Sequence, residues 1–104
     1  MRIHNLYEDE AGESHWRDLQ VDWTEQTLGG RTSRPVPVRA IQYFEVPHTD
    51  GRDWHVVPRR QYVVHLNGGS LITASDGESR IIQAGEVMLL EDVAGRGHQS
   101  RAID

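Results

Sequence analysis

Three side chains that can bind a metal ion are His55, Gln61 and His98, of which the two histidines lie far apart along the sequence. Imidazole nitrogen suits iron, zinc, nickel and copper, whereas a neutral amide oxygen is a weak ligand. If folding brings the three together, they form a three-point site with open positions for water or a substrate. The residue types therefore indicate a weak site for one divalent transition metal (Fe, Zn, Ni or Mn). The alternative is a metal-free arrangement in which the histidines and Gln61 only form hydrogen bonds.

Arg59 lies two residues before Gln61, at the entrance to a stretch with strand character. Residues two apart in a strand project from the same face, so Arg59 is expected to point to the same side as Gln61. Its planar guanidinium can bind a carboxylate through two parallel hydrogen bonds. Arg59 is therefore the predicted binding residue for a small anionic organic substrate, and a solvated surface arginine is the alternative.

Two carboxylates, Glu91 and Asp92, precede His98 by a few residues. A carboxylate beside a histidine can orient the ring, or act as a base where burial raises its pKa. Glu91 is the predicted catalytic residue. The alternative is that one of the two carboxylates forms a structural ion pair with Arg59 or Arg60, which is favoured for Asp92 and left open for Glu91.

The remaining histidines are not expected to bind a metal. His4, His15 and His48 are predicted to lie at the surface or in loops. His65 shares strand parity with Gln61, and it is predicted to be a hydrogen-bonded polar residue deeper in the fold.

Composition narrows the classes of function. The 104 residues fit one domain, and the absence of cysteine excludes disulfides, thiolate metal sites and thiol nucleophiles. A net charge of −5 disfavours nucleic acid as a partner, although all 11 cationic residues are arginine. No apolar run approaches the roughly 20 residues of a membrane helix, and the acidic N-terminus does not resemble an export signal. We therefore expect a cytoplasmic protein with no membrane partner.

Turn-forming sequences punctuate the C-terminal half and separate short strands. Asp76-Gly77 between two apolar runs is a strong hairpin signal, because this pair tolerates the positive φ of a tight turn. The predicted strands are residues 61–66, 70–74, 80–82 and 87–90, and the alternation in VRAIQYFEV predicts a further strand at 38–46.

The N-terminal part has a less regular pattern. Residues 16–23 fit either a helix or a strand, and the β character of the rest favours a strand. Residues 28–37 and 47–53 contain glycine or proline and are predicted to be loops. Seven to nine short strands with no helix predict an antiparallel sandwich or barrel.

The order of these motifs resembles the small single-domain cupins. The first cupin motif has two histidines separated by one residue, then a glutamate four positions on, and a closing glycine. Here His55 stands at the first histidine and Gly68 at the glycine, while Val57 replaces the second histidine and Gln61 the glutamate.

The second cupin motif ends in Pro-x-Gly-x-x-His, which Gly95 and His98 match, with Val93 in place of proline. The stretch HVVPRRQYVVHLNG is similar to a bacterial cupin subgroup that carries His-x-x-Pro-Arg-Arg-Gln and mostly has no assigned reaction. The resemblance implies an all-β, antiparallel double-stranded β-helix (the jelly-roll or cupin barrel). It implies one cupin domain over residues 1–104, with a less regular segment at 1–37 and the barrel core at 38–104.

For the site, the resemblance implies that His55 and Gln61 line the inner wall and that His98 approaches from a neighbouring strand. Two of the four usual ligands are missing, so a metal is expected to be weakly bound or absent. The expected function is binding of a small anionic ligand at the barrel mouth. Metal-assisted oxygenase, isomerase or decarboxylase chemistry would accompany it in an enzyme.

Two other functions stay open. One is a metal-free module that binds or senses a small molecule without catalysis, and the other is a metal-free acid–base enzyme that uses Glu91 with His98. The resemblance also implies a homodimer, because single-barrel cupins commonly pair. Trp16 and Trp23 are candidates for its interface, with core packing as the alternative.

Overall fold

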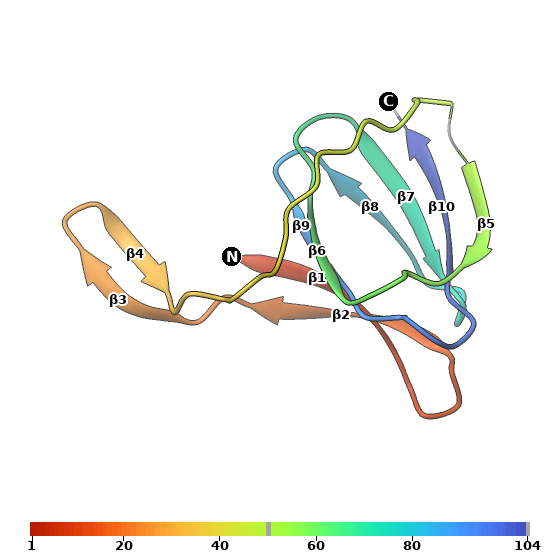
Figure 1. Ribbon diagram of the computed structural model, residues 1–104, viewed down its shortest axis with the longest axis horizontal. Helices are drawn as coiled ribbons and strands as arrows, with labels where there is room; N and C mark the ends of the chain where they lie inside the picture. Colours follow the sequence, from red (N-terminus) through yellow and green to blue (C-terminus); the bar gives the residue numbers. More distant parts are fainter. Residues whose placement is uncertain (50, 104) are drawn as a thin grey trace.

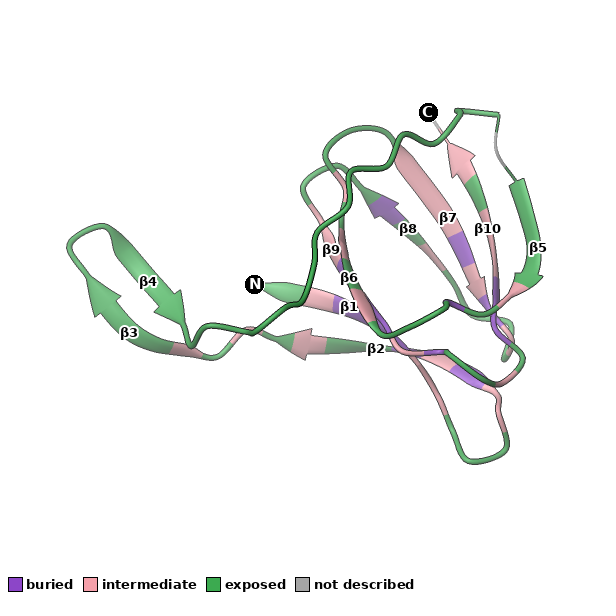
Figure 2. Cartoon of the chain, viewed as in Figure 1, coloured by how far each residue is buried: buried purple, intermediate pink, exposed green. Residues whose placement is uncertain are grey.

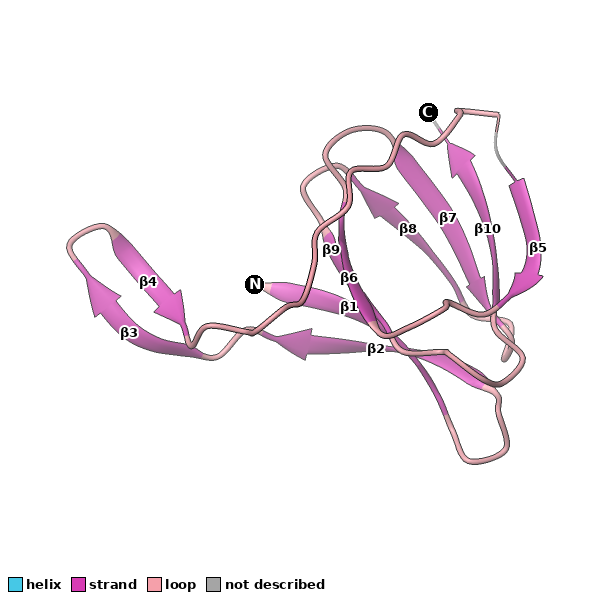
Figure 3. Ribbon diagram, viewed as in Figure 1, coloured by secondary structure: helices cyan, strands magenta, loops and turns pink. Residues whose placement is uncertain are grey.

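The computed structural model describes residues 1–49 and 51–103, and within these ranges it contains ten strands and no helix (Figures 1 and 3). The prediction of an all-β protein is confirmed, with one strand more than the upper expected number. The strands are β1 (Arg2–Glu8), β2 (Ser14–Gln20), β3 (Trp23–Thr27), β4 (Gly30–Ser33), β5 (Gly51–His55), β6 (Gln61–Val64), β7 (Gly69–Ala74), β8 (Ser79–Gln83), β9 (Val87–Leu90) and β10 (His98–Ile103).

The strands form two four-stranded sheets and a separate hairpin. The first sheet has the order β2-β1-β9-β6, the second has the order β5-β10-β7-β8, and β3 pairs with β4. No sheet closes into a barrel within the described residues, and the arrangement is compatible with a β-sandwich. We predicted wholly antiparallel pairing, and this is wrong at one strand pair. Strands β1 and β9 run parallel, with Leu6 beside Leu90. No helix of membrane-spanning length and apolarity occurs in the part of the chain that the structure describes.

The hydrophobic core lies between the two sheets (Figure 2). Successive residues of a strand point to opposite faces, so the strands that line the core contribute alternate side chains, such as Ile72 and Ala74 of β7 or Met88 and Leu90 of β9. Its buried members are Leu6, Trp16, Met88 and Leu90 from the first sheet, Ile72, Ala74 and Ile82 from the second, and Val57 from the connection between β5 and β6. Trp16 is thus a core residue, so the packing alternative is the correct one for this tryptophan.

Three predictions from local pattern are wrong. Residues 38–46 form no strand, although the structure describes all of them. Strand β4 lies inside the predicted loop 28–37, and strand β5 begins inside the predicted loop 47–53. An alternating pattern of side chains is compatible with a strand. A strand forms, however, only where a neighbouring backbone can pair with it through hydrogen bonds. Segment 38–46 has no such neighbour among the residues that the structure describes.

The N-terminal residues are more regular than predicted. Strand β1 is an inner strand of the first sheet, with β2 on one side and β9 on the other. Residues 1–20 are therefore an integral part of the sheet, and the structure does not divide the chain at residue 38. The low apolar content of β1 hid its strand character, since it carries polar side chains on both faces.

A glycine allows β5 and β10 to meet at their ends. Gly97 has a φ of +74°, and a Cβ atom there would overlap the carbonyl oxygen of His55. Only glycine accommodates both the left-handed conformation and this close approach. The turn at Gly77, with a φ of +98°, has open space where its Cβ would be.

We expect Gly97→Ala to destabilise the fold far more than Gly77→Ala. The Gly77 variant carries only the left-handed strain of about 1–2 kcal/mol, whereas the Gly97 variant also pushes β5 and β10 apart and should lose about 3 kcal/mol or more. Urea denaturation of the two variants beside wild type measures the difference. Equal losses in both variants would show that the contact between Gly97 and His55 does not constrain the fold.

Candidate functional site

Strands β5 and β10 bring His55 and His98 together. The two residues are register partners across the strand pair, and their ring centroids are 4.4 Å apart at an interplanar angle of 56°. His98 also pairs with Ala74 of β7, which is a core residue, and directly opposite residues share a face of the sheet. Both imidazoles therefore project toward the space between the sheets.

The His98 ring is oriented by a buried carboxylate. Its Nδ1 lies 2.5 Å from Oδ2 of Asp92, and both side chains are almost completely excluded from solvent. An ionised carboxylate can only accept hydrogen bonds, so Nδ1 carries the proton. In the neutral ring, Nε2 then keeps a lone pair. A carboxylate behind an imidazole is the arrangement that fixes the tautomer of metal-binding histidines.

The His55 ring is set in the same tautomer by the backbone. Its Nδ1 lies 2.7 Å from the carbonyl oxygen of Asp53, which also only accepts, so Nε2 again keeps its lone pair. Burial lowers the pKa of His55, and the nearby His98 ring adds to this effect. A neutral imidazole with a free nitrogen is the form that binds a metal or accepts a hydrogen bond from a ligand.

Gln61 lies on β6, in the sheet opposite the one that carries the two histidines. It is the register partner of Leu90, a core residue, so its half-buried side chain also projects between the sheets. Its amide forms no hydrogen bond to any residue that the structure describes. The three predicted metal ligands thus share one side of their sheets, although only His55 and His98 are in contact with each other.

The position that the resemblance assigns to a second histidine has a structural role here. Val57 is buried in the core, and its backbone N–H donates to the Asp92 carbonyl oxygen at 3.2 Å. Among the described residues there is no group of three or more histidine, cysteine or carboxylate side chains arranged to hold a metal ion. Any ion at this pair therefore has two imidazoles as its strong protein ligands.

Arg59 does not follow the parity on which its prediction rested. It precedes the first residue of β6, in a bend, and it is exposed. Strand alternation begins only at Gln61, so the inward orientation of Arg59 does not follow from it. Arg59 makes no ion pair with any residue in the described ranges, whereas Arg60 does.

Glu91 is held in a structural network on the other side of the first sheet. It follows Leu90, which faces the core, and it accepts hydrogen bonds from Arg60 Nε at 2.6 Å and Asn5 Nδ2 at 2.9 Å. Burial opposes ionisation of Glu91, but these two hydrogen bonds outweigh it and hold its pKa below the usual value. A lowered pKa is the opposite of what the predicted base requires.

The roles of the two acidic residues, Glu91 and Asp92, therefore differ from those expected. Glu91 forms the structural ion pair, and the expectation that Asp92 does so with Arg59 or Arg60 is wrong. The sequence did predict that one of these two carboxylates could orient the His98 ring, and Asp92 is the residue that does so. Which of two adjacent carboxylates takes it depends on where the strand ends, which the sequence pattern did not reveal.

The other histidines divide into core, loop and surface groups. His4 is buried, which corrects the prediction of a surface residue, and it lies between Glu86 (2.9 Å) and Arg80 (3.0 Å). His65 hydrogen-bonds Ser70 at 3.1 Å, as its predicted role requires, and burial lowers its pKa. His15 and His48 agree with their predictions, one bridging surface carboxylates and one in an exposed loop.

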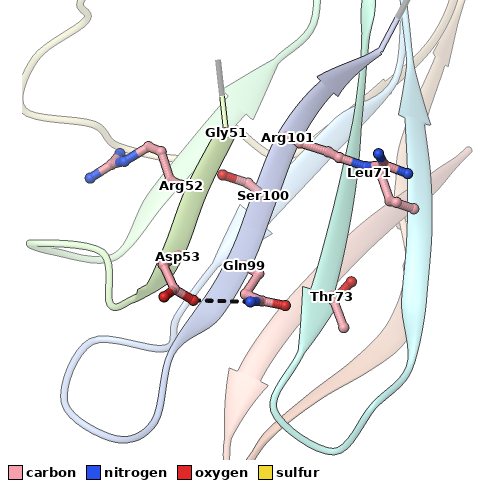
Figure 4. A pocket seen from close by; sticks show the side chains of 8 residues that line it. All are labelled: Gly51, Arg52, Asp53, Leu71, Thr73, Gln99, Ser100 and Arg101. Atoms are coloured by element: carbon pink, nitrogen blue, oxygen red, sulfur yellow. Dashed lines mark hydrogen bonds between the residues drawn. The ribbon is translucent and has the colours of Figure 1, made fainter. Parts of the chain in front are cut away.

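A surface hollow lies on the outer face of the second sheet (Figure 4). Arg52 and Arg101 line it, and Gln99 donates a hydrogen bond to Asp53 at 3.0 Å across it. Side chains alternate along β10, so this hollow and the His98 ring lie on opposite faces. The hollow is therefore a separate feature with its own pair of arginines.

No family model, curated protein or solved structure matches the chain. The likeness to cupins thus rests on the motifs around His55 and His98 alone. The functional argument depends on the geometry of this pair.

We expect Asp92→Asn to release the His98 ring from its single tautomer. Asparagine keeps the volume, but its amide can donate to Nδ1 as well as accept from it, and the loss should be about 1–3 kcal/mol of stability. Long-range ¹H–¹⁵N correlation spectra of the imidazoles read the tautomers directly. His55 is the internal control, because its carbonyl partner is unchanged. A wild-type His98 protonated on Nε2 would contradict the assignment.

Proposed function

We propose that this chain is a cupin-type protein that binds a small anionic organic molecule between its sheets, with the His55–His98 pair at the centre of the site. One observation carries the proposal: two imidazoles in contact, each with Nδ1 bound to an acceptor and Nε2 free. Two neighbouring imidazoles with unprotonated Nε2 atoms can bind a metal ion or accept a ligand proton.

The proposal includes one weakly held divalent transition metal (Fe, Zn, Ni or Mn). His55 and His98 would bind it through Nε2, with the Gln61 amide as a weak third ligand. Such an ion would polarise a carbonyl or carboxylate oxygen of the ligand and stabilise an enolate-like charge, which is chemistry that an isomerase or decarboxylase can use and that would prepare a substrate for an oxygenase. The protein's own contribution is to hold each ring in one tautomer, through the Asp92 carboxylate for His98 and the Asp53 carbonyl for His55.

A metal-free binding or sensing module is the second candidate. It is favoured by Val57, which fills the core where a further imidazole would stand, and by the presence of only two strong ligands. In this case the two Nε2 atoms accept hydrogen bonds from the ligand directly. The acid–base enzyme that uses Glu91 has no comparable support, because Glu91 is bound to Arg60.

Metal titration separates the two candidates. Tag-free protein titrated with Co²⁺, Zn²⁺, Fe²⁺, Ni²⁺ and Mn²⁺ should bind about one equivalent, and Co²⁺ should give the absorption bands of a site with imidazole ligands. His55→Ala and His98→Ala should each abolish the bands, while His48→Ala, in an exposed loop, should leave them unchanged. Wild-type protein that binds none of the ions would eliminate the metal and leave the binding module.

Arg59 is the proposed contact for the carboxylate of the ligand, because it is exposed and free of ion pairs among the described residues beside the entrance to β6. A thermal-shift screen of small mono- and dicarboxylic acids should find compounds that stabilise wild type, with Arg59→Ala losing most of the shift. Arg101→Ala is the matched control, since Arg101 lines the outer hollow. A shift lost in the Arg101 variant but kept in the Arg59 variant would move the anion site to the outer face.

A further inference from the structure

One segment of the chain is exposed along almost its whole length, with only Trp23 at its start partly buried. It consists of the hairpin β3–β4 and the extended residues that follow, and we call residues 23–46 the arm (Figures 1 and 2). The arm carries large apolar side chains that are mostly exposed, with Ile41 at 78%, Tyr43 at 90% and Phe44 at 82%. The others are Leu28, Val36, Val38 and Val46.

The arm has little to stabilise it within one chain. Strands β3 and β4 pair only with each other in the described residues, and an isolated two-stranded hairpin is at best marginally stable in water. The radius of gyration is 14.6 Å, against about 13 Å for a compact domain of this length. Apolar surface of this extent on a single chain normally marks an interaction site.

The body of the same molecule carries a matching surface. Strand β6 is an edge of the first sheet, so one side of its backbone has no strand beside it in the described residues. Its outward side chains are apolar and exposed, with Tyr62 at 37% and Val64 at 57%, and Leu66 continues the row. An unpaired edge with apolar side chains is a template for another strand.

We propose that the arm of one chain lies over strand β6 of a second copy, with residues 38–46 adding as a strand beside β6. The alternation of this segment predicts a strand, and no partner strand lies beside it among the described residues of its own chain. Pairing with β6 of a second copy would supply that partner. Every chain carries both the arm and the receiving edge, so a two-fold dimer satisfies both in a reciprocal exchange.

The size of the exposed surface fits a stable dimer. Tyr43 and Phe44 can each bury about 150–250 Å². Together with the five exposed aliphatic residues of the arm, they approach the roughly 800 Å² that one partner contributes to a standard interface. A second copy is favoured over an unrelated protein because both halves of the interface are present in one sequence.

Point variants test the interface in solution. Sedimentation equilibrium of wild type should give a dimer. Phe44→Asp in the arm and Val64→Asp on β6 should each weaken the dimer by about thirtyfold or more. Ile81→Asp is the matched control, because Ile81 is also an exposed apolar strand residue but lies on β8 of the other sheet. All three side chains are exposed in the single chain, so the substitutions leave its own core intact.

Photo-cross-linking identifies which chain and which residues the arm contacts. Benzoylphenylalanine at position 44, in unlabelled protein mixed with ¹⁵N-labelled wild type, should yield mixed-isotope cross-links to residues 61–66. A monomer at every concentration overturns the proposal. So does cross-linking only within one chain, which means that the arm folds back on its own body. Cross-links between chains that avoid β6 overturn it as well.

Discussion

The buried hydrogen bond between Asp92 and His98 is the constraint on which the site depends. Asp92 is completely buried, and the His98 ring is the only group in the described residues that binds its carboxylate. A carboxylate in such surroundings is costly unless it is paired, so the ring cannot leave without a large loss of free energy. The same residue binds the Val57 N–H through its backbone carbonyl. Asp92 therefore fixes the start of β10 and the connection between β5 and β6 together.

The two histidines differ in the partner that holds the ring and in their burial. His98 is held by a charged partner inside the core, while His55 is held by a backbone carbonyl and is only partly buried. Loss of the proton on Nδ1 is disfavoured in both, so Nε2 is the reactive nitrogen of each ring. A protein acceptor sets the orientation of each ring, independently of any metal ion.

Local pattern was sufficient for much of the fold. Turn signals located β6, β7, β8 and β9, since glycine at tight turns has a conformational cause that the sequence states directly. The convergence of His55 and His98 came from motif order, not from geometry. The sequence failed where the outcome depends on a distant neighbour. Residues 38–46 alternate but lack an adjacent strand.

The exchange between Glu91 and Asp92 has the same origin. Leu90 faces the core at the end of β9, so Glu91 must face away, and the turn that follows directs Asp92 back toward His98. The burial of His4 is another feature that the sequence pattern alone did not predict. It shares parity with Leu6 and therefore faces the core, but an alternation of polar residues gives no sign of which face is buried.

Strand β6 has one face toward the interior of the protein and one face toward solvent. Its inner face carries Gln61 and its outer face carries Tyr62 and Val64. A strand bonded to a neighbour on one side only is the easiest part of a sheet to displace, because half of its backbone groups bind water instead of protein. A chain that paired with this free edge would hold Gln61, the inward residue at the start of β6, more firmly. If the proposed ligand binds beside Gln61, association and ligand binding would be coupled through this one strand.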